Sequence, residues 1–268
     1  MMHTMIRKIY LLLLICAFGC LSACRQNSRS DISELENCDS IPSSIKRLVK
    51  AVADNDSVTF ASLVSYPLAR PYPLRNIDTP EQMRGYYSVM VDDSLRRVLT
   101  SSKPGDWEEY GWRGWSLQRG DYVWVDADLY AVDYISARER AMLDSLTAAD
   151  MGSLHRDLAE GWIPEMCLQT QEDNAVMRID SRKDASIHPR YRLLIYPAGS
   201  NLQGVPPYML NGYCELEGTA GTRVYMFGTP SGREIRFVPD IPDGSTPMVE
   251  FPDTVVAVTP AYWLDLIK

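Results

Sequence analysis

Cysteine and histidine are scarce in this chain. Its 268 residues include six cysteines and three histidines, and none of them stands in a HExxH or CxxC pattern. The GxGxxG and P-loop patterns, which bind phosphates, and the GxSxG pattern of a nucleophilic serine are absent as well. We therefore predict no metal site and no cofactor.

A surplus of basic residues is also lacking. The chain has 27 Lys and Arg against 35 Asp and Glu, which gives a net charge of -8, and no basic stripe runs along it. Proteins that bind nucleic acid hold the phosphate backbone mainly through Lys and Arg. The composition therefore excludes nucleic acid as an expected partner.

The N-terminal apolar run is too short to span a bilayer, which takes about 20 apolar residues. This run, Ile9–Gly19, follows Arg7 and Lys8 and has the length of a secretory signal core. The tetrapeptide LSAC, Leu21–Cys24, comes next. It resembles the lipobox of bacterial lipoproteins, with Leu three positions before the cleavage site and Cys directly after it. An ordinary secretory peptide followed by a chance cysteine is the alternative.

The lipobox resemblance implies a location. A signal peptide, residues 1–23, would be cleaved before Cys24, and Cys24 would be lipidated on its thiol and its new amino group. Several acyl chains on one residue anchor a protein durably. Residues 24–42 would then hold this lipidated cysteine and a polar, flexible tether. We expect a lipid-anchored protein of the cell envelope, in the outer membrane, and the sequence leaves open which face it occupies.

Three further cysteines follow the lipobox, namely Cys38, Cys167 and Cys214. Their number is odd, in a compartment that permits disulfides. Either one pair forms a disulfide or all three stay as thiols, and the sequence leaves both alternatives open.

Apolar spacing and caps predict three helices before residue 101. Apolar residues recur at i, i+3, i+4 and i+7 over 45–52, which indicates the first helix. Asp56 is placed to cap a short second helix. Thr79 and Gln82 have the spacing of a capping box and open a long third helix that ends near Ser101.

The rest of the chain is predicted to be mostly strands. Alternating patterns indicate antiparallel strands and one returning helix, for which we predict a break near Gly152, because glycine disfavours a helix interior. The strands are predicted at 107–117, 121–126, 129–135, 162–171 and 174–180, and the helix at 137–159. From residue 182 to 268, short β-type runs are separated by Gly and Pro every 8–12 residues. We predict a separate all-β domain there, a small sandwich or barrel.

Residues 43–136, the first part of a predicted domain that extends over 43–181, resemble the NTF2-like, cystatin-like α+β superfamily. The resemblance rests on YPL at Tyr66–Leu68, on IDTPEQM at Ile77–Met83, and on the stretches GWRG and GDYVWVDADLYAVDY at 111–114 and 120–134. It implies a cone, in which helices are wrapped by a curved antiparallel sheet and one end stays open as a pocket. The family includes ketosteroid isomerase, dehydratases and epoxide hydrolases, together with secreted members that have no known activity.

Four of the six tryptophans lie within residues 106–126, namely Trp107, Trp112, Trp115 and Trp124. Each indole buries 150–250 Å² when packed, so the rings can fill the inside of a cone without any ligand. The alternative is a platform on which a ligand stacks, and its candidate binding residues are Trp112, Trp115, Tyr122 and Trp124. Stacking of nucleic-acid bases is a third use, which the acidic composition disfavours.

Asp133 is the candidate catalytic residue. It stands on an apolar strand between Val132 and Tyr134, and the resemblance implies an acid that faces the cone. A buried carboxylate there would be a candidate general base. The alternative is that Asp133 faces solvent or pairs with an arginine. No motif of the family maps onto these positions residue by residue, so we assign no catalytic role.

Two functions remain. The first is a membrane-anchored, non-enzymatic binding or interaction protein, whose partner is a small molecule, a glycan or an envelope protein. The second is an enzyme of the isomerase, dehydratase or hydrolase type that acts in the cone pocket on a small apolar molecule. We favour the binding protein, because the enzyme hypothesis rests on the family resemblance alone.

Overall fold

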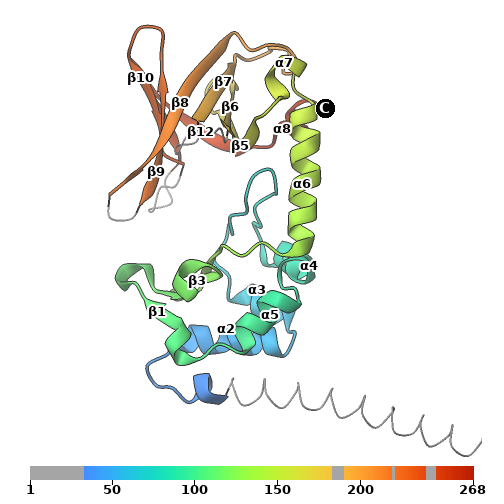
Figure 1. Ribbon diagram of the computed structural model, residues 1–268, viewed down its shortest axis with the longest axis vertical. Helices are drawn as coiled ribbons and strands as arrows, with labels where there is room; N and C mark the ends of the chain where they lie inside the picture. The colour runs from blue at the N-terminus through green and yellow to red at the C-terminus, as the bar shows by residue number, and fades with distance from the viewer. Residues whose placement is uncertain (1–32, 183–189, 219–220, 240–245) are drawn as a thin grey trace, which may run out of the picture. The chain divides into compact units, whose positions relative to one another are not determined.

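The computed structural model describes residues 33–182, 190–218, 221–239 and 246–268 (Figure 1). The predicted signal peptide and Cys24 lie outside these residues, so the lipobox prediction is not tested. No helix in the described part of the chain is long and apolar enough to cross a bilayer. The chain divides into two compact units. The first comprises the described residues up to Arg70 together with Asn76–Arg140, and the second comprises Pro71–Arg75 and Ala141–Lys268.

Two helices of the first unit, α3 (Ser57–Ser62) and α4 (Pro80–Met90), begin at the caps that the sequence predicts. Asp56 accepts hydrogen bonds from the backbone amides of Val58 and Thr59, and the Thr79 side chain accepts one from the amide of Gln82. These bonds satisfy amides that have no partner inside the helix. The helices between residues 43 and 100 are α2 (Ser43–Ala53), α3 (Ser57–Ser62), α4 (Pro80–Met90) and α5 (Asp93–Thr100).

The prediction of one long third helix is wrong. The backbone leaves helical geometry at Val91, with φ −92° and ψ 77°. Asp92 then accepts hydrogen bonds from the amides of Ser94 and Leu95 and so caps a separate helix, α5. Aspartate is a strong helix N-cap, and here it divides a continuous apolar pattern into two helices.

The sheet of the first unit is small. Its four antiparallel strands pair in the order β1-β2-β3-β4, and each has three or four residues. They are β1 (Trp107–Glu109), β2 (Trp115–Leu117), β3 (Val123–Val125) and β4 (Leu129–Val132). A turn at Gly111–Arg113 divides the predicted strand 107–117 into β1 and β2. The predicted NTF2-like cone is therefore wrong, because it needs a long helix and long strands that wrap it, and the chain has neither here.

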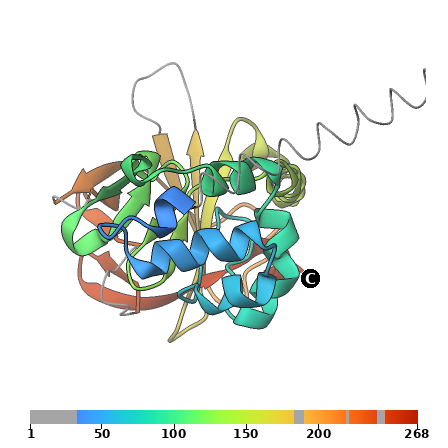
Figure 2. The same cartoon turned by 90° about the horizontal axis from the view of Figure 1, so that it is seen from below.

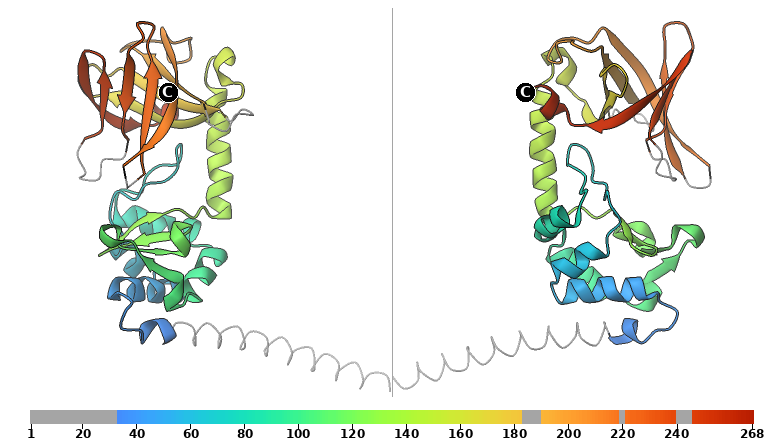
Figure 3. Two further views of the ribbon diagram at one scale, coloured as in Figure 1. Left: turned by 60° about the vertical axis from the view of Figure 1, so that its left-hand side comes forward. Right: turned by 180° about the vertical axis from the view of Figure 1, so that it is seen from behind.

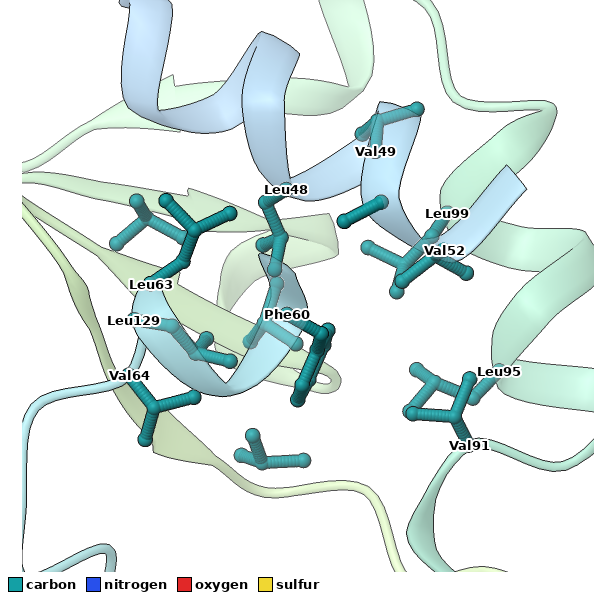
Figure 4. Close-up of a cluster of buried hydrophobic side chains, with 14 of the residues drawn as sticks. Leu48, Val49, Val52, Phe60, Leu63, Val64, Val91, Leu95, Leu99 and Leu129 are labelled. Atoms are coloured by element: carbon teal, nitrogen blue, oxygen red, sulfur yellow. The ribbon is translucent and has the colours of Figure 1, made fainter. Parts of the chain in front are cut away.

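One apolar core fills this unit. Side chains of α2, α3, α5 and β4 meet around Phe60, which is 2% exposed (Figure 4). Figure 2 shows the helices, in blue to teal, gathered beside the green strands. The indole of Trp107 joins this core and donates to the Ser102 hydroxyl at 3.1 Å. One of the four clustered tryptophans is thus a fully buried core residue.

The second unit is a closed antiparallel barrel of eight strands (Figure 3). The strands follow one another around the barrel, and the last strand, β12, closes it by pairing with the first, β5. They are β5 (Ile163–Thr170), β6 (Val176–Arg182), β7 (Arg190–Tyr196), β8 (Tyr208–Glu217), β9 (Thr222–Gly228), β10 (Glu234–Phe237), β11 (Met248–Phe251) and β12 (Thr254–Ala261). The all-β part thus begins at Ile163, and the predicted boundary at residue 182 falls at the end of β6. Strands β5 and β6, predicted for the cone domain, belong to the barrel.

Helices cover one side of the barrel wall. Met151, Leu158 and Trp263 pack with Val176 and Leu194, which point outward from β6 and β7. The helices are α6 (Ala137–Gly152), which begins in the first unit, α7 (Arg156–Ala159) and α8 (Trp263–Leu266). The predicted helix 137–159 does break after Gly152. Cys38, Cys167 and Cys214 form no disulfide within the described chain.

Four charged side chains are buried under these helices. Asp180 of β6 accepts hydrogen bonds from the Nε atoms of Arg178 at 2.7 Å and Arg192 at 2.8 Å. Nη2 of Arg178 also lies 2.5 Å from Asp150. All four are at most 2% exposed. Each buried charge has a partner of opposite sign, which offsets part of the cost of removing it from water.

Residues 71–75 complete the barrel unit, although the first unit precedes and follows them in the sequence. The Tyr72 hydroxyl donates to Asp150 at 2.7 Å and accepts from the amide of Trp263 at 3.1 Å. Arg75 forms an ion pair with Asp265. The segment is thus held by α6 and by the C-terminal helix α8.

Candidate functional site: an aromatic cleft

The turn between β1 and β2 depends on two glycines. Gly111 has φ +59° and Gly114 has φ +72°, backbone conformations that other residues rarely adopt. A Cβ atom on Gly114 would lie 2.5 Å from the carbonyl oxygen of Val125, so this position also leaves no room for a side chain. The amide of Tyr110 donates to the Gly114 carbonyl at 2.7 Å and closes the turn.

This turn presents a tryptophan to solvent. Trp112 is 73% exposed, the largest exposed fraction among the large apolar residues of the described chain. The guanidinium of Arg113 lies over its ring, 5.3 Å from the centroid, where a cation is attracted to the indole face. The Tyr130 hydroxyl donates to the carbonyl oxygen of Arg113 at 2.8 Å. The exposed ring therefore stands on a backbone that is fixed on both sides.

The space beside Trp112 is a cleft of about 330 Å³. Its opposite wall is the turn between β3 and β4, where the amide of Asp126 donates to the Asp128 carbonyl at 3.0 Å. Ser44 of α2 donates its hydroxyl to the Asp126 carbonyl at 2.9 Å and ties this turn to the helix. The lining residues are Ser65, Trp112, Arg113, Asp126, Ala127, Asp128 and Tyr130.

The cleft combines an apolar face with polar groups of both signs. Two aspartates, one arginine, one serine and one tyrosine line the cleft together with the exposed tryptophan. Burial raises the pKa of Tyr130, Asp126 adds to this effect and Arg113 opposes it, so the phenol stays protonated and keeps its hydrogen bond. No group of three or more His, Cys, Asp or Glu in the described ranges is arranged to hold a metal ion.

The other three predicted ligand-binding residues do not line the cleft. Trp115 is half-buried and packs against the core. Tyr122 stacks on Tyr134, with ring centroids 5.7 Å apart and nearly parallel planes. Trp124 lies behind the cleft, 5.2 Å from the ring of Tyr110 and 6.5 Å from that of Tyr130. These rings support the sheet, and of the four candidates Trp112 alone contributes to the cleft.

Asp133 does not face a pocket. It is exposed, and its carboxylate accepts a hydrogen bond from the indole nitrogen of Trp124 at 2.9 Å. The prediction that it faces the interior of a cone is wrong, because the cone is absent and the residue follows the last strand of a short sheet. The enzyme hypothesis placed the reaction in the pocket of this cone, so it has no site in the observed fold.

Sequence reasoning missed most of the cleft. Asp126 and Tyr130 lie in two predicted strands, with Asp128 between these strands, and none of the three was a candidate binding residue. The available signal was the pair Gly111 and Gly114 around Trp112, because glycines at fixed places beside a large ring indicate a built turn. That signal locates the tryptophan but not the opposite wall, which depends on the pairing of β2 with β3.

No protein-family model, curated protein or solved structure matches this chain. The comparisons therefore do not test the NTF2-like resemblance, and the function has to be argued from the cleft itself.

Proposed function

We propose that the chain is a lipid-anchored protein of the cell envelope that binds a glycan, without catalysis, in the aromatic cleft. The observation that carries the proposal is Trp112, which is 73% exposed on a rigid turn opposite two carboxylates. A single exposed ring is ordinary on a protein surface, but a ring that lines a cleft together with several charged and hydroxyl residues indicates a binding site.

Sugars match this combination of groups. The C–H face of a pyranose ring is flat and apolar and packs on an indole, while its hydroxyls both donate and accept hydrogen bonds. Asp126 and Asp128 accept such bonds and Arg113 donates them. A cleft of about 330 Å³ is within the size range of small-molecule sites. Because both walls are fixed by backbone hydrogen bonds, little ordering entropy is lost on binding.

The first test is Trp112→Ala, measured with the full-length chain on a printed array of oligosaccharides and then by titration with the sugars that bind. We expect binding to be lost, while the free energy of unfolding changes by less than ~0.5 kcal/mol, as for other surface substitutions. Val58→Ala, which truncates another exposed apolar residue of the first unit, is the control and should bind like wild type.

The variants Asp126→Asn and Asp128→Asn test the polar wall, and each should weaken binding without abolishing it. A wild-type chain that binds no sugar on the array, or a Trp112→Ala variant that binds as well as wild type, would refute the glycan proposal. Loss of binding together with loss of folded protein would instead assign Trp112 a structural role.

The anchor rests on the lipobox and has its own test. Cys24→Ala should leave the chain unprocessed or soluble, whereas the wild-type chain should enter the detergent phase with the added mass of its acyl chains. Cys38→Ala is the matched control and should behave like wild type. An unchanged membrane fraction and mass for Cys24→Ala would show that this cysteine is not lipidated.

A further inference from the structure

The interior of the barrel is open at the end where β5 turns into β6. A cavity of about 210 Å³ lies there, and its inner surface is apolar. Met177 and Ile195 stand directly opposite each other on β6 and β7, and both face the barrel core. Phe251 and Val256, from β11 and β12, form the other side. The cavity is therefore a gap in the apolar core that reaches the surface.

The rim of this cavity is acidic. Glu172 and Asp173 lie on the β5–β6 turn, and no Lys, Arg or His is among the lining residues. The carboxylate of Asp173 is held in place, since its Oδ1 accepts hydrogen bonds from the Thr170 hydroxyl and from the amide of Ala175. These two bonds, that of Thr170 first, lower the pKa of Asp173, so it stays ionised well into the acid range.

We propose that this barrel mouth is a second binding site, which takes a small organic ammonium ion with its apolar group in the barrel and its charge at Glu172 and Asp173. The site lies in the second unit and does not depend on the glycan proposal. Mouths of β-barrels are common places for small-molecule sites.

The size and charge of the cavity define the ligand class. An engineered apolar cavity of about 150 Å³ holds one benzene molecule. The present cavity of about 210 Å³ has room for one such ring and a short arm. An anionic ligand would meet two carboxylates of like charge, and a neutral one would leave them without a counter-charge. A cation on a short arm satisfies both parts of the site.

The probe is 2-phenylethylammonium, with 2-phenylethanol and phenylacetate as a neutral and an anionic analogue, each titrated into the full-length chain by calorimetry. We expect the ammonium to bind about fivefold more tightly than the alcohol, which is the upper end of the range for a partly exposed charge pair, and the acetate not to bind.

Two kinds of variant separate the parts of the site. Asp173→Asn keeps the Oδ1 acceptor of the turn and removes the charge, so it should reduce ammonium binding and leave alcohol binding unchanged. Val256→Trp should fill the cavity and abolish both. Glu215→Gln, an exposed acid of β8 outside the cavity, is the control for net charge.

The titrations can overturn either the charge assignment or the site itself. Equal affinity for the ammonium and the alcohol, or unchanged ammonium binding by both Asp173→Asn and Glu172→Gln, would overturn the charge assignment. Binding retained by a folded Val256→Trp variant would place the ligand elsewhere, and no binding of any probe by wild type would refute the site. Since Trp112→Ala removes a residue of the first unit only, it should not affect this binding.

Discussion

Gly111 and Gly114 shape the aromatic cleft as much as Trp112, which lies between them. Both have positive φ, but their surroundings differ, because no atom lies within 4 Å of a Cβ on Gly111. On Gly114 the same atom would be 2.5 Å from the Val125 carbonyl oxygen. The two positions therefore separate the cost of the backbone conformation from the cost of a clash.

We predict that Gly111→Ala destabilises the chain by about 1–2 kcal/mol, the cost of a left-handed conformation for an L-residue. Gly114→Ala carries that strain and a clash with backbone atoms of β3, so it should cost about 3 kcal/mol or more, in the class of overpacked or strained sites. Chemical denaturation of both variants measures the difference. Equal costs would mean that the turn moves away from β3 without penalty, and the cleft would then be less rigid than its hydrogen bonds indicate.

At the scale of elements, one carboxylate connects three segments of the first unit. Asp92 caps α5, accepts hydrogen bonds from the Tyr134 hydroxyl after β4 at 2.9 and 3.0 Å, and accepts a longer one, at 3.4 Å, from the amide of Ala137 at the start of α6. Burial by itself would raise the pKa of Asp92, but the hydrogen bonds from the Leu95 amide and from Tyr134 outweigh it and hold the pKa below its ordinary value.

This lowered pKa predicts how stability depends on pH. The charged form of Asp92 is favoured by folding, so its contribution is complete above the unfolded-state value of about 3.9 and disappears as the pH falls through the lower folded-state value. Asp92→Asn should therefore cost about 1–2 kcal/mol at pH 7, and less at an acidic pH below about 3.9.

Thr79→Ala is the matched control for Asp92→Asn, because it removes the neutral cap of α4. It should cost about 1 kcal/mol at both pH values. Urea denaturation at pH 7 and at the lowest pH where the chain stays folded measures both variants. A loss for Asp92→Asn that does not change with pH would mean that the hydrogen bonds act through geometry and not through the charge.

The same elements show how far the sequence predicts this fold. Helix starts at Asp56 and Thr79 were predictable, because capping is local chemistry within four residues. The end of α4 was not, because the apolar pattern continues through Val91 and only the cap at Asp92 ends the helix. The strands β5 and β6 were located in the sequence but given to the wrong domain. The pairing of β12 with β5, which closes the barrel, joins segments that no local pattern relates.

The aromatic cleft was predictable to the same extent, since its local features are visible in the sequence and the strand pairing that completes it is not. The exposure of Trp112 was one of two alternatives that the sequence left open, and the glycines beside it were the local signal. The role of Trp107 as a core residue and of Trp124 as a partner of Asp133 depends on which strands pair, and periodicity does not determine this pairing. The prediction of a cone failed for that reason, since it extended a local likeness to a long-range arrangement.

At the scale of the whole molecule, the two units have separate cores. The core around Phe60 draws its residues from 35–132, and that around Phe227 from 168–258. Phe60 is 2% exposed and Phe227 is fully buried, so truncation of either ring to alanine should cost about 3–5 kcal/mol within its own unit. Because no residue is shared between these two cores, we expect each substitution to lower the stability of one unit only.

Hydrogen exchange tests this independence, and residues 71–75 make the test specific. The segment is flanked on both sides by the first unit, yet Tyr72 bonds to Asp150 and Trp263 of the barrel unit. The amide of Leu74, which donates to the Pro71 carbonyl at 2.9 Å, reports on this segment. Its exchange should become faster in Phe227→Ala, together with that of the barrel strands, and should not change in Phe60→Ala, where α2 and α3 exchange faster. If Leu74 instead follows α2 and α3, the segment unfolds with the first unit despite its contacts. If each substitution accelerates exchange in both units, the chain unfolds as one cooperative body, and the two cores depend on each other for their stability.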